Sequence, residues 1–256
     1  MGVVNVTPNS FSPSTRHLDP AEAVAYALRL TSQGADIIDV GGEATNPAAE
    51  PVSASEELQR TLPVIERLVA ADVTVSVDTT KAAVARAAVA AGARYINDVS
   101  GGLFDPEMPG AIGDATYICG HLRGRTLREV FSDENRPVHW LEVAEELSAR
   151  LSGLPAAARA RAWIDPGVGF GKGADAQTNL ELLRHAGDLE RSVGCRVVVG
   201  PSRKRFIRAL VGKPNPSDPE LDQASVWASL AAVDSGASMV RIHNVALLSD
   251  ALRHGS

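Results

Sequence analysis

Acids, amides and bases recur in this sequence directly after short runs of Val and Ile. They are Asn5, Asp39, Asp78, Asn97, Asp98, His121, Asp165, Ser202 to Lys204, Arg241 and His243. One Asp in such a place is usually a helix cap or a turn former. Burying an unpaired polar group costs about 1–3 kcal/mol, however, so the recurrence of these groups indicates that they share a ligand.

The first set of these residues offers hydrogen-bond acceptors together with one cationic donor. Asp78, Asn97 and Asp165 supply carboxylate and amide groups, and Lys204 supplies an ammonium group. A carboxylate can accept two parallel hydrogen bonds from an amidine-like N–C–NH2 edge. This set is therefore suited to a flat, nitrogen-rich heterocycle.

The second set offers donors near the first and the last of the apolar runs. It comprises Asn5, Arg241 and His243, and a helix expected to begin at Asn244 and Val245 adds backbone N–H groups. A parallel α/β barrel commonly holds phosphate in this region. The Cys and His residues lack the spacing of a zinc site, and no Ser-His-Asp arrangement stands out. The second set predicts an anion site, and metalloenzyme and triad chemistry are disfavoured.

Eight apolar runs precede these residues and are predicted to be strands. They are residues 2–6, 36–40, 74–77, 95–97, 116–119, 162–164, 196–199 and 238–242. Each is too short for a helix and nearly continuous in apolar residues, which is typical of strands buried on both faces. Helical periodicity follows each run, over residues 20–33, 54–70, 80–91, 137–151, 178–193, 202–211, 222–235 and 246–254.

This alternation predicts a (β/α)8 barrel, an α/β fold, over the whole chain. Strand–helix units repeated eight times close a barrel more readily than they build an open sheet. A barrel of about 250 residues would use all 256 residues as one domain, residues 1–256. The longest irregular stretches, residues 8–19, 41–53 and 120–136, each follow a strand and are expected on the face where barrels build their sites.

Composition excludes several classes of protein. The formal charge of −6 and the lack of a basic stripe argue against a nucleic-acid partner. No apolar run approaches the ~20 residues of a membrane span, and the first residues lack the features of a signal peptide. Cys119 and Cys195 are the only cysteines. We interpret both as reduced, buried residues of a cytoplasmic protein.

Seven segments resemble dihydropteroate synthase, in order and along nearly the whole chain. They are MGVVNVTPNSFS, DVGGEATNP, SVDT, INDVSGG, DPGVGFGK, GPSRKR and VRIH. SVDT and INDVSGG are weak signals singly, whereas DPGVGFGK with SRK and RIH at these spacings is specific. The combination separates this family from the related pterin-dependent methyltransferase barrels. The family is a sulfonamide target, and its members usually carry an N-terminal hairpin before the first strand, where this chain starts at that strand.

The resemblance implies a role for each matching residue. For the pterin ring it implies Asp78, Asn97, Val99, Asp165, Phe170, Gly200, Lys204 and Arg241. For pyrophosphate it implies Asn5, Arg241 and His243, with Mg2+ held by the substrate and Asn5. For p-aminobenzoate it implies Phe11, Thr45, Asn46, Pro47, Lys204 and Arg205, and it makes Asp78, Lys204, Arg241 and His243 the catalytic residues. Asp39 is expected to support the floor of the site.

The reaction implied is the condensation of 6-hydroxymethyl-7,8-dihydropterin pyrophosphate with p-aminobenzoate. The products are 7,8-dihydropteroate and pyrophosphate, so the chain is expected to be a transferase of folate biosynthesis. Cationic groups and Mg2+ would neutralise the leaving group. Little proton chemistry is required, so positioning should account for most of the rate. The resemblance also suggests a homodimer through the late helices, although the apolar residues from 226 to 233 fit a buried helix equally well.

The match departs from the family in the first two loops. Asn9 and Pro13 stand where the family usually has acids, and Asn46 stands where it has Arg. After SRK, Arg205 replaces Ser, and after RIH, Asn244 replaces Asp. These changes fit two hypotheses. In the first, Arg205 supplies the cation that position 46 no longer provides, because Arg binds carboxylate in a bidentate fork. In the second, the chain is a divergent paralogue that binds the pterin but uses another acceptor or is non-catalytic.

Overall fold

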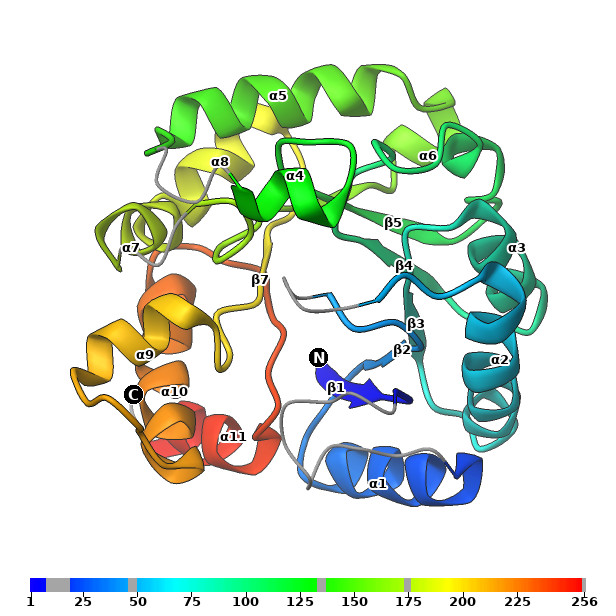
Figure 1. The fold of residues 1–256 in the computed structure, drawn as a ribbon, viewed down its shortest axis with the longest axis horizontal. Helices are drawn as coiled ribbons and strands as arrows, with labels where there is room; N and C mark the ends of the chain where they lie inside the picture. The colour runs from blue at the N-terminus through cyan, green and yellow to red at the C-terminus, as the bar shows by residue number, and fades with distance from the viewer. Residues whose placement is uncertain (8–18, 46–49, 133–136, 173–175, 255–256) are drawn as a thin grey trace.

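The computed structural model describes residues 1–7, 19–45, 50–132, 137–172 and 176–254, and its central feature is a ring of parallel strands (Figure 1). The strands are β1 (Gly2–Asn5), β2 (Ile38–Gly41), β3 (Val75–Asp78), β4 (Tyr95–Asp98), β5 (Thr116–Gly120), β6 (Trp163–Asp165), β7 (Val198–Val199) and β8 (Met239–Val240). All eight overlap the predicted runs. The expected α/β barrel is confirmed.

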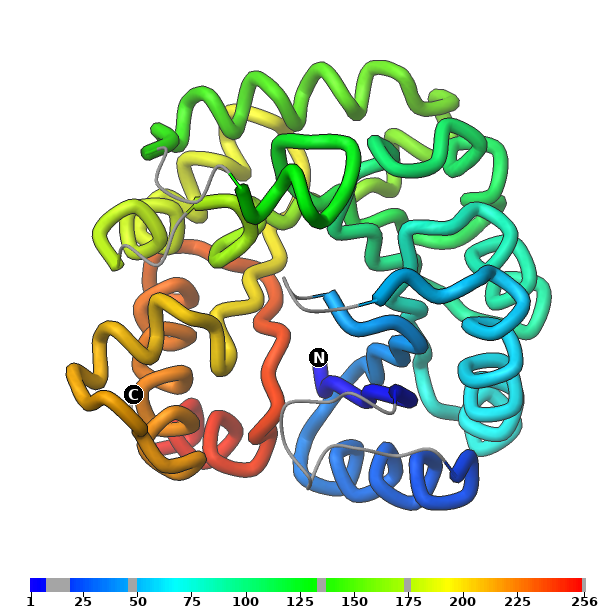
Figure 2. The backbone as a smooth tube through the Cα atoms, viewed as in Figure 1, coloured from blue at the N-terminus to red at the C-terminus, as the bar shows by residue number. Residues whose placement is uncertain are grey.

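Closure of the barrel depends on two sheets that meet through isolated bridges. Strands β1 to β6 pair in sequence order in one parallel sheet, and β7 pairs with β8 in a second. Single parallel bridges join Ile164 to Val197 and Gly2 to Ile242. The last strand, β8, therefore lies next to the first strand, β1, and the tube in Figure 2 shows the last strand segment beside the first.

Helices surround the strands on the outside of the barrel (Figure 1). They are α1 (Pro20–Ser32), α2 (Ala54–Ala70), α3 (Ala82–Ala90), η2 (Met108–Gly110), α4 (Leu127–Ser132), α5 (Trp140–Ser152), α6 (Ala156–Arg159), α7 (Ala176–Arg184), α8 (Ala186–Val193), α9 (Arg205–Val211), α10 (Asp218–Asp234) and α11 (Val245–His254). Capping residues in the sequence determine where several of these helices begin. Asp19 caps α1 by accepting from the Ala21 amide at 2.8 Å, and Pro20 occupies the first turn.

One predicted helix, over residues 178–193, is two helices in the structure. The break falls at His185, between α7 and α8. There the amide of Gly187 donates to the carbonyl of Ser235, at 2.7 Å. This tertiary hydrogen bond replaces one that a continuous helix would make, so the backbone turns. The short helices α4 and α6 were not predicted, because one or two turns leave too little periodicity.

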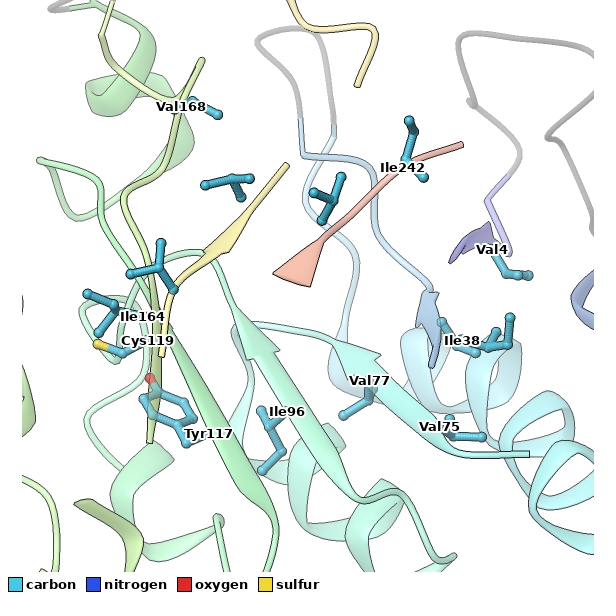
Figure 3. Packing of buried hydrophobic residues seen from close by; sticks show 14 of the residues in the cluster. Val4, Ile38, Val75, Val77, Ile96, Tyr117, Cys119, Ile164, Val168 and Ile242 are labelled. Carbon is cyan, nitrogen blue, oxygen red and sulfur yellow. The ribbon is translucent and has the colours of Figure 1, made fainter. Parts of the chain in front are cut away.

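Apolar side chains fill both sides of the strand ring. Figure 3 shows Val4, Ile38, Val77, Ile96 and Ile164 in the packed layer between strands and helices. A second, smaller cluster lies inside the barrel. Its members are Met1, Ile37, Ile118 and Val198, with Tyr95, Trp163 and Met239 packed against them. The barrel interior is therefore a packed core below the site and not a pore.

The helices and the cysteines can be compared with what the composition predicts. No helix in the described part of the chain is long and apolar enough to cross a membrane. Cys119 and Cys195 are free thiols, and burial raises the pKa of Cys119 to about 12. The expectation that both are buried is wrong for Cys195, which is half-buried because it lies between α8 and β7 and not within a strand.

Candidate functional site

The polar residues at the strand ends form the upper layers of the barrel interior. Side chains on a strand alternate between its two faces, so residues two apart point the same way. Two positions beyond the apolar interior residues Ile37, Tyr95, Trp163 and Met239 stand Asp39, Asn97, Asp165 and Arg241. On the other four strands the equivalent positions hold Asn5, Asp78, Gly120 and Gly200. The interior thus changes from apolar to polar within one step on β1, β2, β4, β6 and β8.

Arg241 is the centre of this polar layer. Its Nε lies 2.5 Å from Oδ2 of Asp39, and its Nη2 lies 2.5 Å from Oδ2 of Asp78. Asn97 donates to the same Asp39 oxygen, at 3.0 Å. Burial opposes the charge of Arg241, but the two carboxylates outweigh it and raise the pKa of the guanidinium above its ordinary value. Asp39, which is fully buried, is therefore placed beneath the site as the shared partner of Arg241 and Asn97.

The carboxyl group of Asp78 has an unusual proton affinity. Burial raises its pKa to about 7, against the opposing effect of Arg241. Beside it, Gly41 has no side chain. A Cβ at that position would lie 3.6 Å from Oδ2 of Asp78 and 3.7 Å from Oδ1 of Asn5. Gly41 thus lies beside both polar side chains and adds no side chain of its own.

Lys204 forms the opposite wall of the site. Its Nζ donates to the carbonyl of Val168 at 2.6 Å and lies 3.8 Å from the centre of the Phe170 ring. Burial lowers the pKa of this ammonium group to about 7. The backbone of Gly169, at φ +78°, passes so close that a Cβ there would stand 2.5 Å from the Lys204 side chain. Glycine is required at this position by both the conformation and the contact.

Asp165, Val99 and Gly200 lie at the ends of the remaining strands. One oxygen of Asp165 accepts from the amide of Gly167 at 2.7 Å. Val99 follows β4 and is half-buried. Gly200 lies beside Arg241, since a Cβ at this position would stand 3.7 Å from the Arg241 side chain.

His243 lies on the side of the first and last strands and pairs with Ser202. Its Nδ1 is 2.9 Å from the Ser202 hydroxyl, which also accepts from the His243 amide at 3.2 Å. Burial, with a further contribution from Arg241, lowers the pKa of His243 to about 3. The imidazole is therefore neutral at physiological pH. It can donate one hydrogen bond to an anion through Nε2 but does not add a positive charge.

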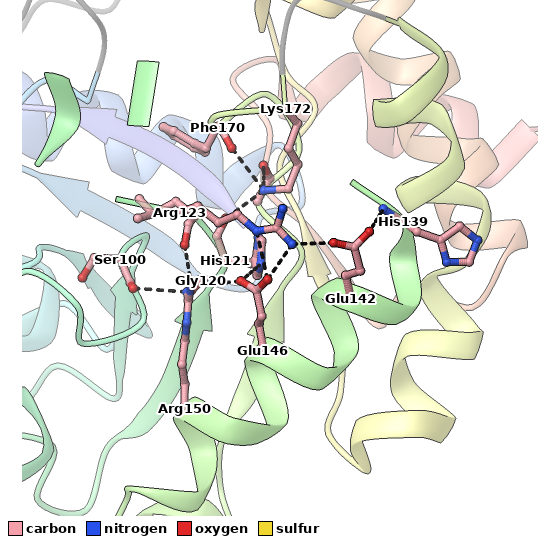
Figure 4. Close-up of polar contacts among 12 residues, drawn as sticks. Ser100, Gly120, His121, Arg123, His139, Glu142, Glu146, Arg150, Phe170 and Lys172 are labelled. Atoms are coloured by element: carbon pink, nitrogen blue, oxygen red, sulfur yellow. Dashed lines mark hydrogen bonds and ion pairs between the residues drawn. The ribbon is translucent and has the colours of Figure 1, made fainter. Parts of the chain in front are cut away.

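Three strand-end residues do not face the site. His121 follows Gly120 by one position, so it points outward, and Figure 4 shows it turned toward Glu146 of α5, whose Oε2 is 3.0 Å from its Nε2. Asp98 follows Asn97 in the same way and accepts from Ser100, Gly102 and Tyr117. The expectation that all strand-end polar groups converge is wrong for Asp98 and His121, because neighbouring residues of a strand point to opposite faces. It is also wrong for Arg203, whose guanidinium binds Asp222 of α10.

Lys172 was missed by the sequence reasoning although it lies in the DPGVGFGK segment. It is 3% exposed, and its Nζ donates to the carbonyls of His121, Gly167 and Phe170 at 2.9, 3.0 and 3.1 Å. Burial lowers its pKa well below the ordinary value. Figure 4 shows it above the Arg123 and His121 network. The only signal was its place within the motif.

The residues expected to bind an acceptor are only partly described. Thr45 is half-buried after β2, and Arg205 is exposed at the start of α9. Phe11, Asn46 and Pro47 lie outside the described residues, as do Asn9 and Pro13. Of the residues expected to bind p-aminobenzoate, the described residues thus include Thr45, Lys204 and Arg205.

Comparison with known proteins agrees with this geometry. Residues 1–243 match the pterin binding enzyme family. The dihydropteroate synthase of Mycobacterium leprae is 40% identical over 265 residues, which cover 99% of this chain and 90% of that protein.

Solved structures give the same result. The Xanthomonas albilineans dihydropteroate synthase in complex with 7,8-dihydropteroate has a TM-score of 0.83 and 40% identity, covering 99% of this chain and 90% of that one. The same enzyme has been solved with 4-aminobenzoic acid. The Yersinia pestis dihydropteroate synthase, solved with a sulfonamide drug complex, has a TM-score of 0.89 and 33% identity, covering 99% and 91%.

The chain belongs to the pterin binding enzymes, whose family model it matches over residues 1–243. Within the family its relatives and neighbours are dihydropteroate synthases, and the expected activity, that of a dihydropteroate synthase and hence a transferase, is confirmed. The comparisons give no sign of the divergent paralogue.

Proposed function

We propose that this chain joins 6-hydroxymethyl-7,8-dihydropterin pyrophosphate to p-aminobenzoate, with the residues of the upper barrel layers in the roles given below. The observation that carries the assignment is the polar layer above an apolar interior, which unites Asp39, Asn97 and Arg241 in one hydrogen-bonded group. A ligand at this end of the barrel would meet acceptors, an amide and the cations Lys204 and Arg241.

The pterin ring binds between Asp78, Asn97, Asp165 and Lys204 in this proposal. The carboxylates accept from the amino-pyrimidine edge, and Lys204 donates to a ring acceptor. The ring of Phe170 and the side chain of Val99 line the pocket, while Gly200 leaves space beside Arg241. Nζ of Lys204 lies 3.8 Å from the centre of the Phe170 ring, which supports a site in which both side chains contact the same ligand.

Pyrophosphate binds toward Asn5, Arg241 and His243. Arg241 supplies positive charge, and neutral His243 supplies one hydrogen bond. The Asn5 carboxamide oxygen is a hard ligand of the kind that Mg2+ prefers, and Mg2+ commonly takes one or two protein ligands with phosphate and water completing its shell. No group of three His, Cys, Asp or Glu within the described ranges is arranged to hold a metal. Asn5 therefore fits a metal that arrives with the substrate. When bound, Mg2+ would neutralise charge on the pyrophosphate.

The chemistry exchanges one bond for another. The methylene C–O bond breaks, and its electron pair leaves with pyrophosphate, toward Arg241. The amine lone pair of p-aminobenzoate forms the new C–N bond, and the amine proton goes to the released pyrophosphate or to water. Positive charge that develops on the pterin methylene is stabilised by Asp78 and Asp165. Orientation of the two substrates accounts for most of the rate in this scheme.

The acceptor binds over the second and seventh strand ends, near Phe11, Thr45, Asn46, Pro47, Lys204 and Arg205. Arg205 at the start of α9 is the cation for the carboxylate of p-aminobenzoate. Its support is its exposure and its position directly after Lys204. Arg binds a carboxylate through two parallel hydrogen bonds.

Release of pyrophosphate tests the function directly. The purified chain is incubated with the pterin substrate and Mg2+, with and without p-aminobenzoate, and pyrophosphate and dihydropteroate are both measured. Stoichiometric formation of the two products is expected. Binding of the pterin without turnover would refute the proposal, and release only with other amines would indicate a changed acceptor.

Three further proposals concern the whole protein. We propose one domain over residues 1–256, a cytoplasmic location and a homodimer. Two free cysteines support a reducing compartment. Trp227 of α10 is 65% exposed, and Leu210 of α9 and Leu252 of α11 are 43% and 46% exposed. Large apolar side chains on neighbouring helices support an interface with a second copy.

A further inference from the structure

Strands β7 and β8 are the least securely paired strands of the barrel. Each has two residues, and two residue pairs join them. Only isolated bridges link them to β6 and β1. Yet their loops carry Lys204 and His243, which the proposed function places on the two ends of one substrate. Backbone pairing ends before either residue, so other contacts have to hold the two loops in place.

The loop after β7 contains a strained residue. Arg203 has φ +58°, in the left-handed region that non-glycine residues rarely adopt. It stands between Ser202, the partner of His243, and Lys204. Helix α10 holds Arg203 from outside the site, because the Arg203 amide donates to the hydroxyl of Ser225 on this helix, at 3.0 Å. Strain at a single residue persists only where the surroundings hold it.

The guanidinium of Arg203 is bound by a carboxylate of the same helix. Its Nε lies 2.7 Å from Oδ1 of Asp222, and its Nη2 lies 3.0 Å from Oδ2. This is the bidentate geometry that makes Arg–carboxylate pairs strong. The Asp222 side chain is 9% exposed, so solvent screens the pair weakly.

Asp222 also holds the loop after β8. Its Oδ2 accepts from Nδ2 of Asn244 at 3.0 Å, and Asn244 directly follows His243. The other side-chain atom of Asn244, Oδ1, accepts from the Leu247 amide at 3.1 Å and caps α11. One carboxylate on α10 therefore binds both loops, and the Ser202–His243 pair lies between its two contacts.

We propose that Asp222 is a positioning residue of the reaction, which sets the distance between Lys204 and His243 without touching either substrate. The inference rests on the proposed function, since it concerns the same site. Its expected effect is selective. Loss of Asp222 weakens binding of the pyrophosphate end of the pterin substrate more than it weakens binding of p-aminobenzoate, because its contacts with Arg203 and Asn244 lie on either side of the Ser202–His243 pair.

The amide at position 244 makes a sharp test possible. In Asp222→Asn, the amide oxygen can still accept from Arg203 and Asn244, as Oδ2 does in the wild type, but an NH2 group replaces Oδ1 opposite Nε of Arg203 and the negative charge is lost, so the bidentate ion pair is broken. In Asn244→Asp, the cap of α11 survives because Asp also accepts from Leu247, but two carboxylates face each other. In the double variant, the amide at position 222 donates to the carboxylate at 244 and accepts from Arg203 through one hydrogen bond, so each loop is again bound to α10.

The experiment measures KM for both substrates and the binding of inorganic pyrophosphate with Mg2+ by calorimetry. Each single variant should raise KM for the pterin substrate and weaken pyrophosphate binding by about tenfold, the order expected when a charge-assisted hydrogen bond is lost. The double variant should recover most of this loss, which a double-mutant cycle reports as coupling. Asp218→Asn is the matched control, because Asp218 is 54% exposed and meets the same Arg203 at 3.5 Å. It should change little.

Several outcomes would overturn the inference while leaving the function intact. Wild-type kinetics in a folded Asp222→Asn would do so, as would losses that simply add in the double variant, or an equal rise in KM for p-aminobenzoate. If Asp222→Asn does not fold, Asn244→Asp and the double variant decide the matter, since recovery in the double variant requires the coupling. An inactive wild-type enzyme would instead refute the proposed function.

Discussion

Arg241 and Asp78 form an ion pair across the mouth of the barrel, with Nη2 2.5 Å from Oδ2, although their strands β8 and β3 are not neighbours. In the proposed role of Asp78, the pterin edge and Arg241 share one carboxylate, which is possible because each of its oxygens can accept more than one hydrogen bond. The positive charge of Arg241 opposes the effect of burial and favours the ionised carboxylate that the ring requires.

The pH dependence of the reaction follows from Asp78 and Lys204. In its proposed role Asp78 has to be ionised to accept from the pterin, and its pKa is raised to about 7, so kcat/KM should fall as the pH drops below 7. Lys204 must be protonated to donate, and its pKa is lowered to about 7, so kcat/KM should also fall as the pH rises above 7. A bell-shaped profile centred near neutrality is expected for the pterin substrate.

Variants separate the two limbs of that profile. Lys204→Arg keeps its charge at high pH, so the alkaline limb should disappear while the acid limb stays. Titration of the substrate's own phosphates is the same for every variant and cancels in the ratio to wild type. An unchanged alkaline limb in Lys204→Arg would show that another group titrates there.

Asp165→Asn tests the assignment of the pterin ring. The amide oxygen still accepts from Gly167, so the loop should keep its conformation and only the charge and one acceptor are lost. We expect binding of an unreactive hydroxymethylpterin to weaken by about a hundredfold or more, because a charged bidentate contact is lost. Calorimetry measures this, with Asp114→Asn, a fully exposed acid, as control. Near-normal affinity would refute the assignment.

The success and the failure of the sequence reasoning have the same structural cause. A barrel strand presents one residue in two to the interior, so an apolar run that ends in Asp or Asn identifies an interior polar group, as at Asp39 and Asn97. The same alternation sends Asp98 and His121 outward, away from the site. The face to which each strand-end side chain points can be counted from the apolar run before it, and this count would have placed Asp98 and His121 outside the barrel.

Other parts of the site could not be found in the sequence. Asp222 looks like any acid on an amphipathic helix, and its role depends on contacts with Arg203 and Asn244 that arise only in three dimensions. The left-handed backbone of Arg203 carries no sequence signal either, because Gly or Asn would be the usual residue there. Tertiary contacts override local preference at this loop.

Arg205→Gln tests the acceptor site. If Arg205 binds the carboxylate of p-aminobenzoate, its loss should raise KM for this substrate by about tenfold, the value of one charge-assisted contact. KM for the pterin substrate should hardly change. The neutral acceptor p-aminobenzamide should be used equally well by both enzymes, and Arg208→Gln on the same helix serves as control. Equal effects on the charged and the neutral acceptor would contradict the role.

Trp227→Glu tests the proposed homodimer. A carboxylate at the centre of an apolar interface is costly to bury, so the variant should sediment as a monomer at concentrations where the wild type sediments as a dimer. Leu141→Glu is the control, since Leu141 is 48% exposed on α5, away from α10. Equal sedimentation of wild type and Trp227→Glu would place the interface elsewhere or exclude it.

Lys172→Met tests whether the buried ammonium group fixes the loop after β6. The substitution keeps the length of the side chain but leaves the carbonyls of His121, Gly167 and Phe170 without their shared donor. Unsatisfied buried groups cost about 1–3 kcal/mol each. The Gly167 carbonyl still accepts from the Phe170 amide, so we take a loss of about 3 kcal/mol in total. Since 1 kcal/mol shifts Tm by about 2–4 °C in a protein of this size, a drop of roughly 6–12 °C is expected. Lys213→Met, which removes an exposed ion pair with Glu220, should lower Tm by about 1–2 °C at most.

Because Phe170 and Lys204 meet through this loop, Lys172→Met should also raise KM for the pterin substrate at temperatures where it is fully folded. A stable variant with unchanged KM would mean that the loop holds its conformation without the lysine.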